Sequence, residues 1–283
     1  MLKRLRLLVA TTATMVALTG VLAGPVAAVT DGALDGGDHP FVGLMLAQDS
    51  NGNPLWRCSG TLVNETLFVT AGHCTEAPAA KAVLYFETGP IVTDTHYLSV
   101  ASGGTGCANA DVTGYPCRGG ATGSVYTHPQ YDPDAFFLFD LGVVVADSPI
   151  AMAEYGQLPT LNQLDSLKPR RSTTFTSVGY GLQKSFPDAA GWKDEAIKVR
   201  MVAHPHLLQI NTGFTGDASL LLSNNANTGG TCFGDSGGPN FVGTSNVMAG
   251  VTSFGLNPTC GGTGGVYRID RSDDLDWLAT FQD

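Results

Sequence analysis

One serine of the chain lies in a glycine-rich run, Gly234-Asp235-Ser236-Gly237-Gly238-Pro239. Glycine lets a backbone turn sharply and approach a substrate closely, and successive N–H groups that point into one concavity can stabilise an oxyanion. The run therefore indicates a serine nucleophile, Ser236. The same pattern is typical of the nucleophile turn of lipases and esterases, and a glycine-rich turn without chemistry is the non-catalytic alternative.

The order of bases and acids along the chain separates these enzyme classes. In lipases and esterases the histidine follows the serine, but the last histidine here is His206, which excludes that class. The subtilisin order of Asp, His and Ser needs an early acid such as Asp31, Asp35 or Asp38, and nothing else in the sequence supports it. The order His, Asp, Ser remains.

The favoured base is His73, which follows the apolar segment 67–71 and directly precedes Cys74. A disulfide at Cys74 would fix the backbone of a base whose position matters to within about 1 Å. The pair in His204-Pro205-His206 suggests a metal site, but no third ligand lies nearby, so we interpret both as structural. The other histidines are His39, His96 and His128.

The favoured acid is Asp140, which stands between two apolar segments, 136–139 and 141–145. A carboxylate in such surroundings is costly to bury unless it is hydrogen-bonded or paired. An imidazole is a natural partner, because the carboxylate then fixes its tautomer and stabilises its cation. The alternative is that Asp140 faces solvent at the end of a strand.

The elements that must position these residues are expected to be short strands. The 36 glycines and 15 prolines among 283 residues favour strands and turns over long helices. The expected strands are 41–47, 67–71, 82–87, 136–146, 173–178, 197–203, 219–222, 247–254 and 265–269. Strands and helices do not alternate, so the predicted fold class is all-β. One helix is expected at the end, where Leu275, Leu278 and Phe281 would share a face.

The ends and the charge of the chain restrict its function further. Residues 1–28 begin with basic residues, continue with an apolar stretch and finish with Val26-Ala27-Ala28, which predicts a cleaved signal peptide; a membrane anchor is the alternative. A linker at 147–159 then divides the rest into two halves, 29–156 and 157–283. The formal net charge of −10 repels phosphate backbones and anionic lipids, which excludes a nucleic-acid binder.

Export to an oxidising compartment changes how the cysteines are interpreted. They are even in number and lack a Cys-x-x-Cys pair, so they predict disulfides and not zinc, although six cysteines allow fifteen pairings. The six are Cys58, Cys74, Cys107, Cys117, Cys232 and Cys260.

Taken together, the motifs resemble the chymotrypsin/trypsin-like serine peptidases in a secreted bacterial form. Cys58-Ser59-Gly60-Thr61-Leu62 and the His73 motif match the histidine region of that family, and Asp140-Leu141-Gly142-Val143-Val144 matches its aspartate strand. The Ser236 motif matches its nucleophile loop. Ser253-Phe254-Gly255 and Gly265-Val266-Tyr267-Arg268 match the walls of its substrate pocket.

The resemblance implies two six-stranded antiparallel β-barrels with a C-terminal helix and an active site between the barrels. It implies a serine endopeptidase in which Ser236 attacks a peptide carbonyl, His73 accepts and returns the proton, and Asp140 orients His73. The N–H groups of Gly234 and Ser236 would form the oxyanion hole. No cofactor and no metal are implied.

The resemblance also implies particular disulfides and an activation step. Family pairing joins Cys58 to Cys74 and Cys232 to Cys260, which leaves Cys107 and Cys117 to each other. The family's usual Ile-Val-Gly-Gly start is replaced by Val29-Thr30-Asp31-Gly32. We expect signal peptidase to free the ammonium of Val29, which would pair with Asp235. The stretch 87–118 is longer than usual and is interpreted as an inserted surface loop.

The expected substrate pocket has a floor near Gly230 and Thr231. Its walls are expected at Ser253, Phe254, Gly255 and Gly265. Because no acid lies on that floor, we expect a large apolar side chain before the scissile bond rather than Lys or Arg.

The expected partners follow from the implied activity. They are protein or peptide substrates, with a protein inhibitor as a further class that fits. We expect a secreted, extracellular monomer without a nucleic-acid partner, and without a membrane partner once the signal peptide is removed. Two other functions stay open, namely a catalytically inactive binding module and an esterase on the same fold.

Overall fold

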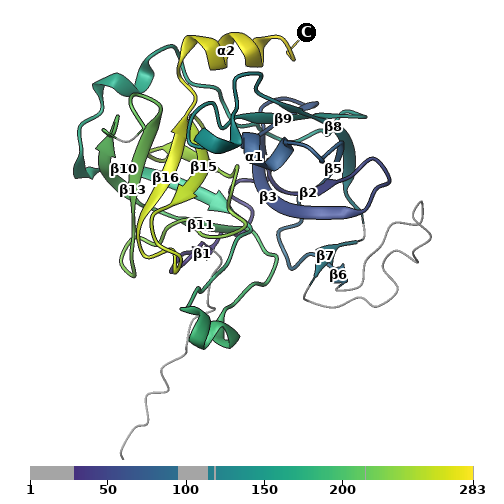
Figure 1. Ribbon diagram of the computed structural model, residues 1–283, viewed down its shortest axis with the longest axis horizontal. Coiled ribbons are helices and arrows are strands. Elements are labelled where there is room, and N and C mark those ends of the chain that lie inside the picture. The colour runs from purple at the N-terminus through teal and green to yellow at the C-terminus, as the bar shows by residue number, and fades with distance from the viewer. Residues whose placement is uncertain (1–28, 95–113, 118, 214, 283) are drawn as a thin grey trace, which may run out of the picture.

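The structure is a computed structural model that describes residues 29–94, 114–117, 119–213 and 215–282 (Figure 1). The strands of each half close into an antiparallel barrel of six strands, which confirms the expected fold class. The predicted signal peptide, His96, Cys107 and most of the inserted loop lie outside the described residues. Within the described residues, no helix has the length and apolar character needed to cross a membrane.

The first barrel has the strand order β2-β3-β4-β9-β8-β5 and closes through the pairing of β5 with β2. Its strands are β2 (Val42–Gln48), β3 (Pro54–Leu62), β4 (Leu67–Thr70), β5 (Lys81–Tyr85), β8 (Ala121–Thr127) and β9 (Gly142–Ala146). Every residue of β2 is buried. Met45 packs in the main core with Phe68, whereas Leu44 packs in a second cluster with Tyr180 of the other half. The strand therefore has apolar neighbours on both faces.

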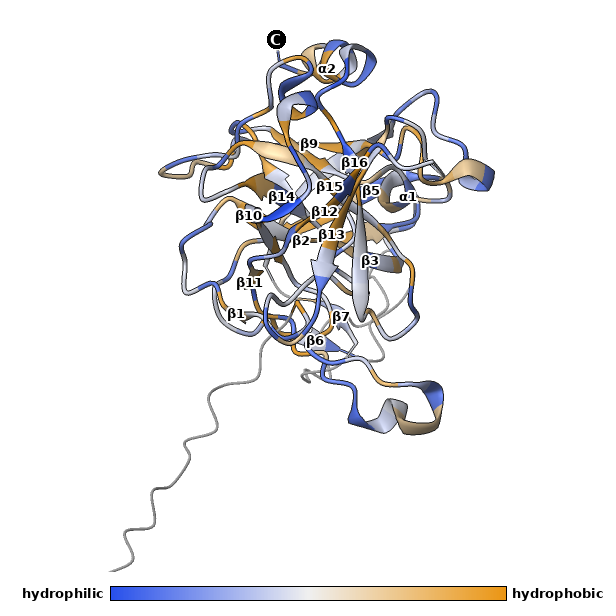
Figure 2. Cartoon of the chain, turned by 90° about the vertical axis from the view of Figure 1, so that its left-hand side faces the viewer, coloured by the Kyte–Doolittle hydropathy of each residue, from blue (hydrophilic) through white to orange (hydrophobic). Residues whose placement is uncertain are grey.

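The second barrel closes because β10 pairs with both β12 and β14. Its strands are β10 (Arg170–Gly179), β12 (His206–Ile210), β13 (Ser219–Asn224), β14 (Pro239–Val242), β15 (Met248–Gly255) and β16 (Gly262–Arg268). Phe175, Leu207 and Leu220 pack in its apolar core. Figure 2 shows apolar residues along β13, whereas part of β10 is polar, because this strand begins with two arginines.

Each end of the described chain packs on the barrel that it does not belong to in sequence. The short strand β1 (Ala33–Leu34) pairs with β11 (Met201–Ala203), which extends the second barrel beyond β10. The helix α2 (Ser272–Ala279) packs on the first barrel (Figure 1), where the Trp277 ring meets His128 edge-on and His128 stacks on Phe139. The predicted helix is present, and Leu278 on it is buried.

A buried ion pair links the N-terminal segment to both barrels. The Nε of Arg200 donates to Asp35 at 2.8 Å, and neither side chain is exposed. The Nη1 of Arg200 donates to the carbonyls of Val42 and Phe86 in the first half of the chain. Asp35 therefore has a structural role, and burial, which by itself raises its pKa, is outweighed by hydrogen bonds from His39 and Arg200 that lower the pKa to about 2.

Two strand predictions were too long. Strand 136–146 begins only at Gly142, because Phe139 has a left-handed backbone (φ +53°) and the N–H of Leu141 turns back to the carbonyl of Phe139. Strand 197–203 is limited to β11. Strands β3, β8, β12 and β14 were not predicted. The remaining elements are α1 (Gly72–Thr75), β6 (Thr93–Asp94), β7 (Tyr115–Pro116) and the 3₁₀ turns Pro133–Ala135, Gln163–Ser166 and Asp188–Lys193.

Candidate active site

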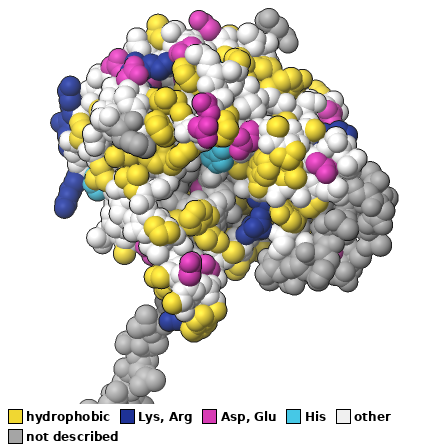
Figure 3. All heavy atoms as spheres, in the orientation of Figure 1, with side chains coloured by type: hydrophobic (Ala, Val, Ile, Leu, Met, Phe, Trp, Pro, Cys, Tyr) yellow, Lys and Arg dark blue, Asp and Glu magenta, His cyan; other side chains and the backbone are white. Residues whose placement is uncertain are grey.

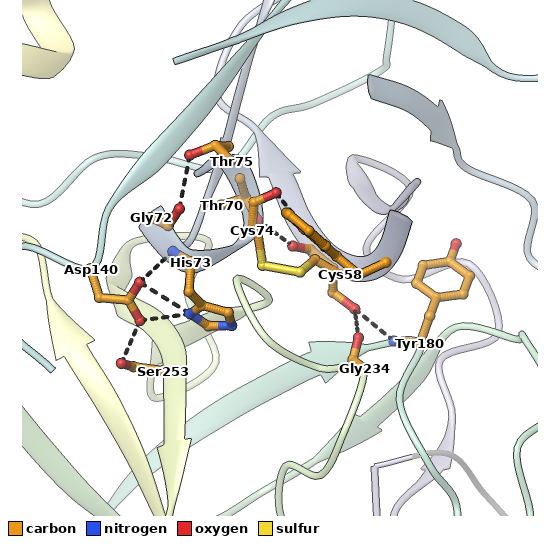
Figure 4. Close-up of a disulfide and its surroundings, with 12 residues drawn as sticks. Cys58, Thr70, Gly72, His73, Cys74, Thr75, Asp140, Tyr180, Gly234 and Ser253 are labelled. Atoms are coloured by element: carbon orange, nitrogen blue, oxygen red, sulfur yellow. Dashed lines mark hydrogen bonds and ion pairs between the residues drawn. A yellow bond between two sulfur atoms is a disulfide. The ribbon is translucent and has the colours of Figure 1, made fainter. Parts of the chain in front are cut away.

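The helical turn α1 presents His73 at the end of strand β4 (Figure 4). The disulfide between Cys58 and Cys74 ties this turn to β3, and the indole N–H of Trp56 donates to the carbonyl of Cys74 at 2.8 Å. The backbone on both sides of the histidine is therefore held by covalent and hydrogen bonds. This restricts the imidazole to a small region between the two barrels.

Three donors surround the carboxylate of Asp140, which is completely buried. The backbone N–H of His73 donates to Oδ1 at 2.9 Å, and Nδ1 of the same residue lies 3.0 Å from Oδ2. The hydroxyl of Ser253 donates to Oδ2 at 2.5 Å (Figure 4). The carboxylate is therefore fully paired, and its contact with Nδ1 places Nε2 of the ring toward the cleft.

The electrostatic surroundings of His73 favour its cation. Burial disfavours the charged imidazole, but the Asp140 carboxylate, its hydrogen bond and the more distant Glu76 outweigh burial, so the pKa of His73 is raised above its usual value. The ring is still 26% exposed. Figure 3 shows histidine atoms in a hollow of the surface with acidic side chains beside them. A base in this position can accept a proton and be stabilised as the cation.

The loop that carries Ser236 is pressed against the histidine region of the first barrel. The carbonyl of Ser236 accepts the N–H of Ser59 at 2.8 Å, next to the disulfide-bonded Cys58. Gly237 has φ +76°, and a Cβ there would lie only 2.7 Å from the backbone nitrogen of Ala71. Only glycine can occupy this contact.

The structure thus brings the loop of Ser236 to the backbone two residues before His73. Within the described residues no hydrogen bond joins the Ser236 hydroxyl to the imidazole. Such bonds are often long in enzymes without bound substrate.

The backbone N–H groups of the serine loop fall into two sets. The N–H groups of Asp235, Gly237 and Gly238 donate to carbonyls of the protein. Within the described residues, those of Gly234 and Ser236 make no hydrogen bond. The carbonyl of Gly234 accepts the Ser59 hydroxyl at 2.9 Å, which fixes this peptide (Figure 4). Gly234 and Ser236 are both only half-buried. Two free donors in one loop, on either side of Asp235, are a candidate oxyanion site.

The carboxylate of Asp235 lies behind this loop and has no exposed surface. It accepts the N–H groups of Gly181 and Cys232, both at 2.8 Å. Burial raises its pKa to about 7, against the lowering effect of these two bonds and of Lys198.

The residue expected to pair with Asp235 lies elsewhere in this form of the chain. Val29 is buried with Val199, Met201 and Ala203, and the hydrogen bonds of Asp235 within the described residues do not involve it. The next residue, Thr30, is held by a backbone bridge to Gly230. The pairing of Val29 with Asp235 stays a prediction.

A cavity of about 430 Å³ opens beside Ser236. Four of the predicted pocket residues line it, namely Thr231, Ser253, Phe254 and Gly255. The other two do not: Gly230 packs against Asn224, and Gly265 lies under the ring of Phe254. No lining residue in the described part of the chain is acidic. Further lining residues that the sequence did not suggest are Phe136, Phe233, Leu256, Asn257 and Pro258.

Disulfide bonds hold the backbone around the candidate active site. Two of the three expected disulfides, Cys58–Cys74 and Cys232–Cys260, are present, and the second lines the cavity. Cys117 is described but Cys107 is not, so the third expected pair lies outside the described residues. Cys58, His73 and Cys74 lie close enough together to suggest a metal site. Their sulfur atoms are bonded to each other, however, and thiolates are the metal-binding form.

The hydrogen bond from Ser253 to Asp140 was missed by sequence reasoning. Ser253 was expected only as a pocket wall, because nothing in the sequence indicates which acid its hydroxyl would meet 113 residues away. The hydrogen bond from the Ser59 hydroxyl to the Gly234 carbonyl is only weakly indicated by the sequence. The one indication is that Ser59 directly follows Cys58 in the histidine region.

Comparison with known proteins agrees with this arrangement. The chain is 28% identical to a trypsin of Saccharopolyspora erythraea over 230 residues, which cover 81% of this chain and 87% of that protein. It is 23% identical to ovochymase of Halocynthia roretzi over 229 residues, which cover 78% of this chain but only 13% of that protein.

Solved structures show the same fold. An HL collagenase superposes with a TM-score of 0.62 at 18% identity and covers 89% of this chain and 97% of its own. Human heparin binding protein superposes with a TM-score of 0.58 at 19% identity, over 89% and 95%. The sequence profile described as Trypsin matches residues 35–278, which is most of the chain. The chain therefore belongs to the trypsin family of serine peptidases.

Proposed function

We propose that the protein is a secreted serine endopeptidase that cleaves peptide bonds through an acyl-enzyme on Ser236. The observation that carries this proposal is the Asp140–His73 pair beside a serine loop in which, among the described residues, the N–H groups of Gly234 and Ser236 have no acceptor. Residues 29–156 and 157–283 would supply one barrel each to a single catalytic unit, and residues 1–28 would direct export.

In this mechanism the groups act in a fixed order. His73 removes the proton of the Ser236 hydroxyl as its oxygen attacks the scissile carbonyl. The N–H groups of Gly234 and Ser236 bind the oxyanion, and losing one such donor typically costs about 3–4 kcal/mol. His73 then protonates the leaving amine, and water attacks the acyl-enzyme by the same path in reverse. Asp140 holds the tautomer of His73 throughout.

The cavity beside Ser236 favours a large apolar side chain immediately before the scissile bond. Phe254 and Leu256 line it, and no acid of the described residues is present to bind Lys or Arg. About 430 Å³ is enough space for an aromatic ring.

Processing at Val29 is supported by the local backbone. Val29 has φ +59°, a conformation in which a β-branched residue is strained by about 1–3 kcal/mol. Cleavage between residues 28 and 29 removes that dihedral constraint and creates an ammonium. The new charge could then reach Asp235, whose pKa of about 7 reflects a buried carboxylate without a full partner.

A binding module without catalysis is the alternative function. The fold alone does not exclude it, since a neighbour with the same fold is known by its heparin binding. A fluorophosphonate probe separates the two, because it labels only an activated serine. We expect it to label Ser236 in the processed protein and to leave Ser236→Ala unlabelled. A folded, processed protein that does not react would favour the binding module, and hydrolysis of esters but of no peptide would favour an esterase.

A further inference from the structure

A second cavity, of about 290 Å³, lies next to the serine loop. Phe233 lines both cavities, Ser236 lines only the first, and Gly234 lines only the second. The two cavities therefore flank the candidate oxyanion site. If the acyl part of a substrate occupies the first cavity, the second lies along the leaving segment.

The second cavity contains two cations, Arg57 from β3 and Lys198 from the segment before β11. The guanidinium of Arg57 lies 5.6 Å from the ring centre of Tyr115 and donates to the carbonyl of Gly114. The ammonium of Lys198 donates to the carbonyl of Ala196 at 2.6 Å, and the residue is only 6% exposed. Among the described residues, neither cation has a carboxylate within ion-pair distance, and none of the cavity's lining residues is acidic.

Keeping both side chains charged in this cavity is unfavourable in the absence of an anion. Burial lowers the pKa of Arg57, and burial together with repulsion from Arg57 lowers that of Lys198 to about 8. Asp235 acts in the opposite direction on Lys198, but its oxygens are turned to the N–H groups of Gly181 and Cys232. Two cations therefore line one cavity. The carboxylate of Asp235 offsets only part of the charge of Lys198. A bound anion would relieve this imbalance.

We propose that the Arg57–Lys198 cavity binds a carboxylate in the leaving segment of the substrate, and so selects peptides that are acidic shortly after the scissile bond. The inference rests on the proposed peptidase function and names a specificity of that same site. Arg57 offers a planar fork that can bind both oxygens of a carboxylate. Lys198 adds a second donor from the opposite barrel.

The test compares matched peptides that carry Glu or Gln at the first, second or third position after the scissile bond. At one of these positions we expect kcat/KM to be roughly 10–100-fold higher for Glu, the range of a charge-assisted hydrogen bond. A further pair, with a free or an amidated C-terminus, shows whether a terminal carboxylate can supply the same chemistry. Equal rates for all acidic and amide pairs would overturn the inference.

Variants connect the preference to the cavity. Arg57→Gln and Lys198→Met should each lower the Glu/Gln ratio toward 1, chiefly by raising KM for the Glu peptide. Lys81→Met removes one positive charge from an exposed residue at the start of β5 and should leave the ratio unchanged. A ratio that survives both cavity variants, in proteins that still react with the fluorophosphonate probe, would show that another part of the molecule binds the acid.

One further substrate separates this inference from the proposed function. An ester that carries only the acyl side chain does not enter the second cavity. If the unmodified enzyme hydrolyses it but shows no acidic preference in peptides, only the present inference fails. If it hydrolyses neither the ester nor any peptide, the proposed function fails.

Discussion

The two carboxylates of the candidate active site, Asp140 and Asp235, are equally buried but differently paired. Asp140 accepts hydrogen bonds from the backbone and ring of His73 and from the hydroxyl of Ser253. Asp235 accepts only two backbone N–H groups, and within the described residues no cation lies within ion-pair distance of it. Burial raises the pKa of Asp235 to about 7. The fold thus gives Asp140 three donors, of which one is a titratable ring, and gives Asp235 two backbone donors.

This difference suggests which part of the site is built by folding alone. The His73–Asp140 pair is held within the first barrel by α1, the Cys58–Cys74 disulfide and the turn before β9. The loop behind Ser236 contains a buried acid that is costly when ionised. An ammonium made by cleavage at Val29 would complete it. If cleavage at Val29 supplies this ammonium, the base and its acid are in place before processing, whereas the oxyanion loop gains a partner afterwards.

The largest effect is expected from breaking the pair that is already complete. Asp140→Asn should lower kcat by about 10⁴-fold, as the same change does in the general Ser-His-Asp template, because an amide does not hold the required tautomer of the histidine. Hydrolysis of an ester substrate, normalised to the concentration of folded enzyme, measures this. The control Asp134→Asn changes an exposed acid of the nearby turn and should keep full activity. Retention of a tenth of the activity in Asp140→Asn would contradict the role of Asp140.

A smaller effect, opposite in sign for activity and stability, is expected at Asp235. In the processed enzyme, Asp235→Asn should lower kcat by about 10²–10³-fold, the range for loss of one oxyanion donor. In a chain that still carries residues before Val29, the same change should stabilise the fold above pH 7.

The sign at Asp235 follows from proton binding. The folded state binds the proton more tightly than the unfolded state, whose pKa lies near 3.8. The contribution of this group to stability is therefore full below pH 3.8 and is lost as the pH rises to 7, by up to about 4 kcal/mol. Urea unfolding at pH 5 and pH 8, in a Ser236→Ala background, measures the difference. If Asp235→Asn destabilised the unprocessed chain at pH 8, the claim that the ionised Asp235 lacks sufficient partners would be wrong.

The smallest effect is expected in the pH dependence that the His73–Asp140 pair gives to the reaction. Because Asp140 raises the pKa of His73, kcat/KM should fall as the pH drops through a value above the usual 6.5, where the protonated ring no longer accepts a proton. The rate of fluorophosphonate labelling between pH 4 and 9 gives the midpoint without a substrate. A rate that does not change down to pH 4 is incompatible with His73 as the base.

Much of the site could be predicted because its residues carry their own local signals. The glycines around Ser236 and the cysteine beside His73 restrict the backbone directly, and the order of the three residues excludes other classes. The segment before Asp140 was harder, since four apolar residues in 136–139 resemble a buried strand, whereas Phe139 in fact turns the chain. Strand β8 was missed because it is half-exposed and alternates with polar residues.

The second cavity could not be predicted from local sequence. Arg57 and Lys198 are 141 positions apart, and each alone is an ordinary basic residue of an acidic protein. Only the closure of both barrels brings them to one cavity. The same holds for Ser253 and Asp140, whose hydrogen bond joins β15 to the turn before β9.

The helix α2 connects the second half of the chain to the acid of the first half. The Trp277 ring meets His128 edge-on, and His128 stacks on Phe139, the neighbour of Asp140. A substitution that loosens α2 is therefore expected to disturb the turn that carries Asp140, although no residue of the helix lines the cavity beside Ser236.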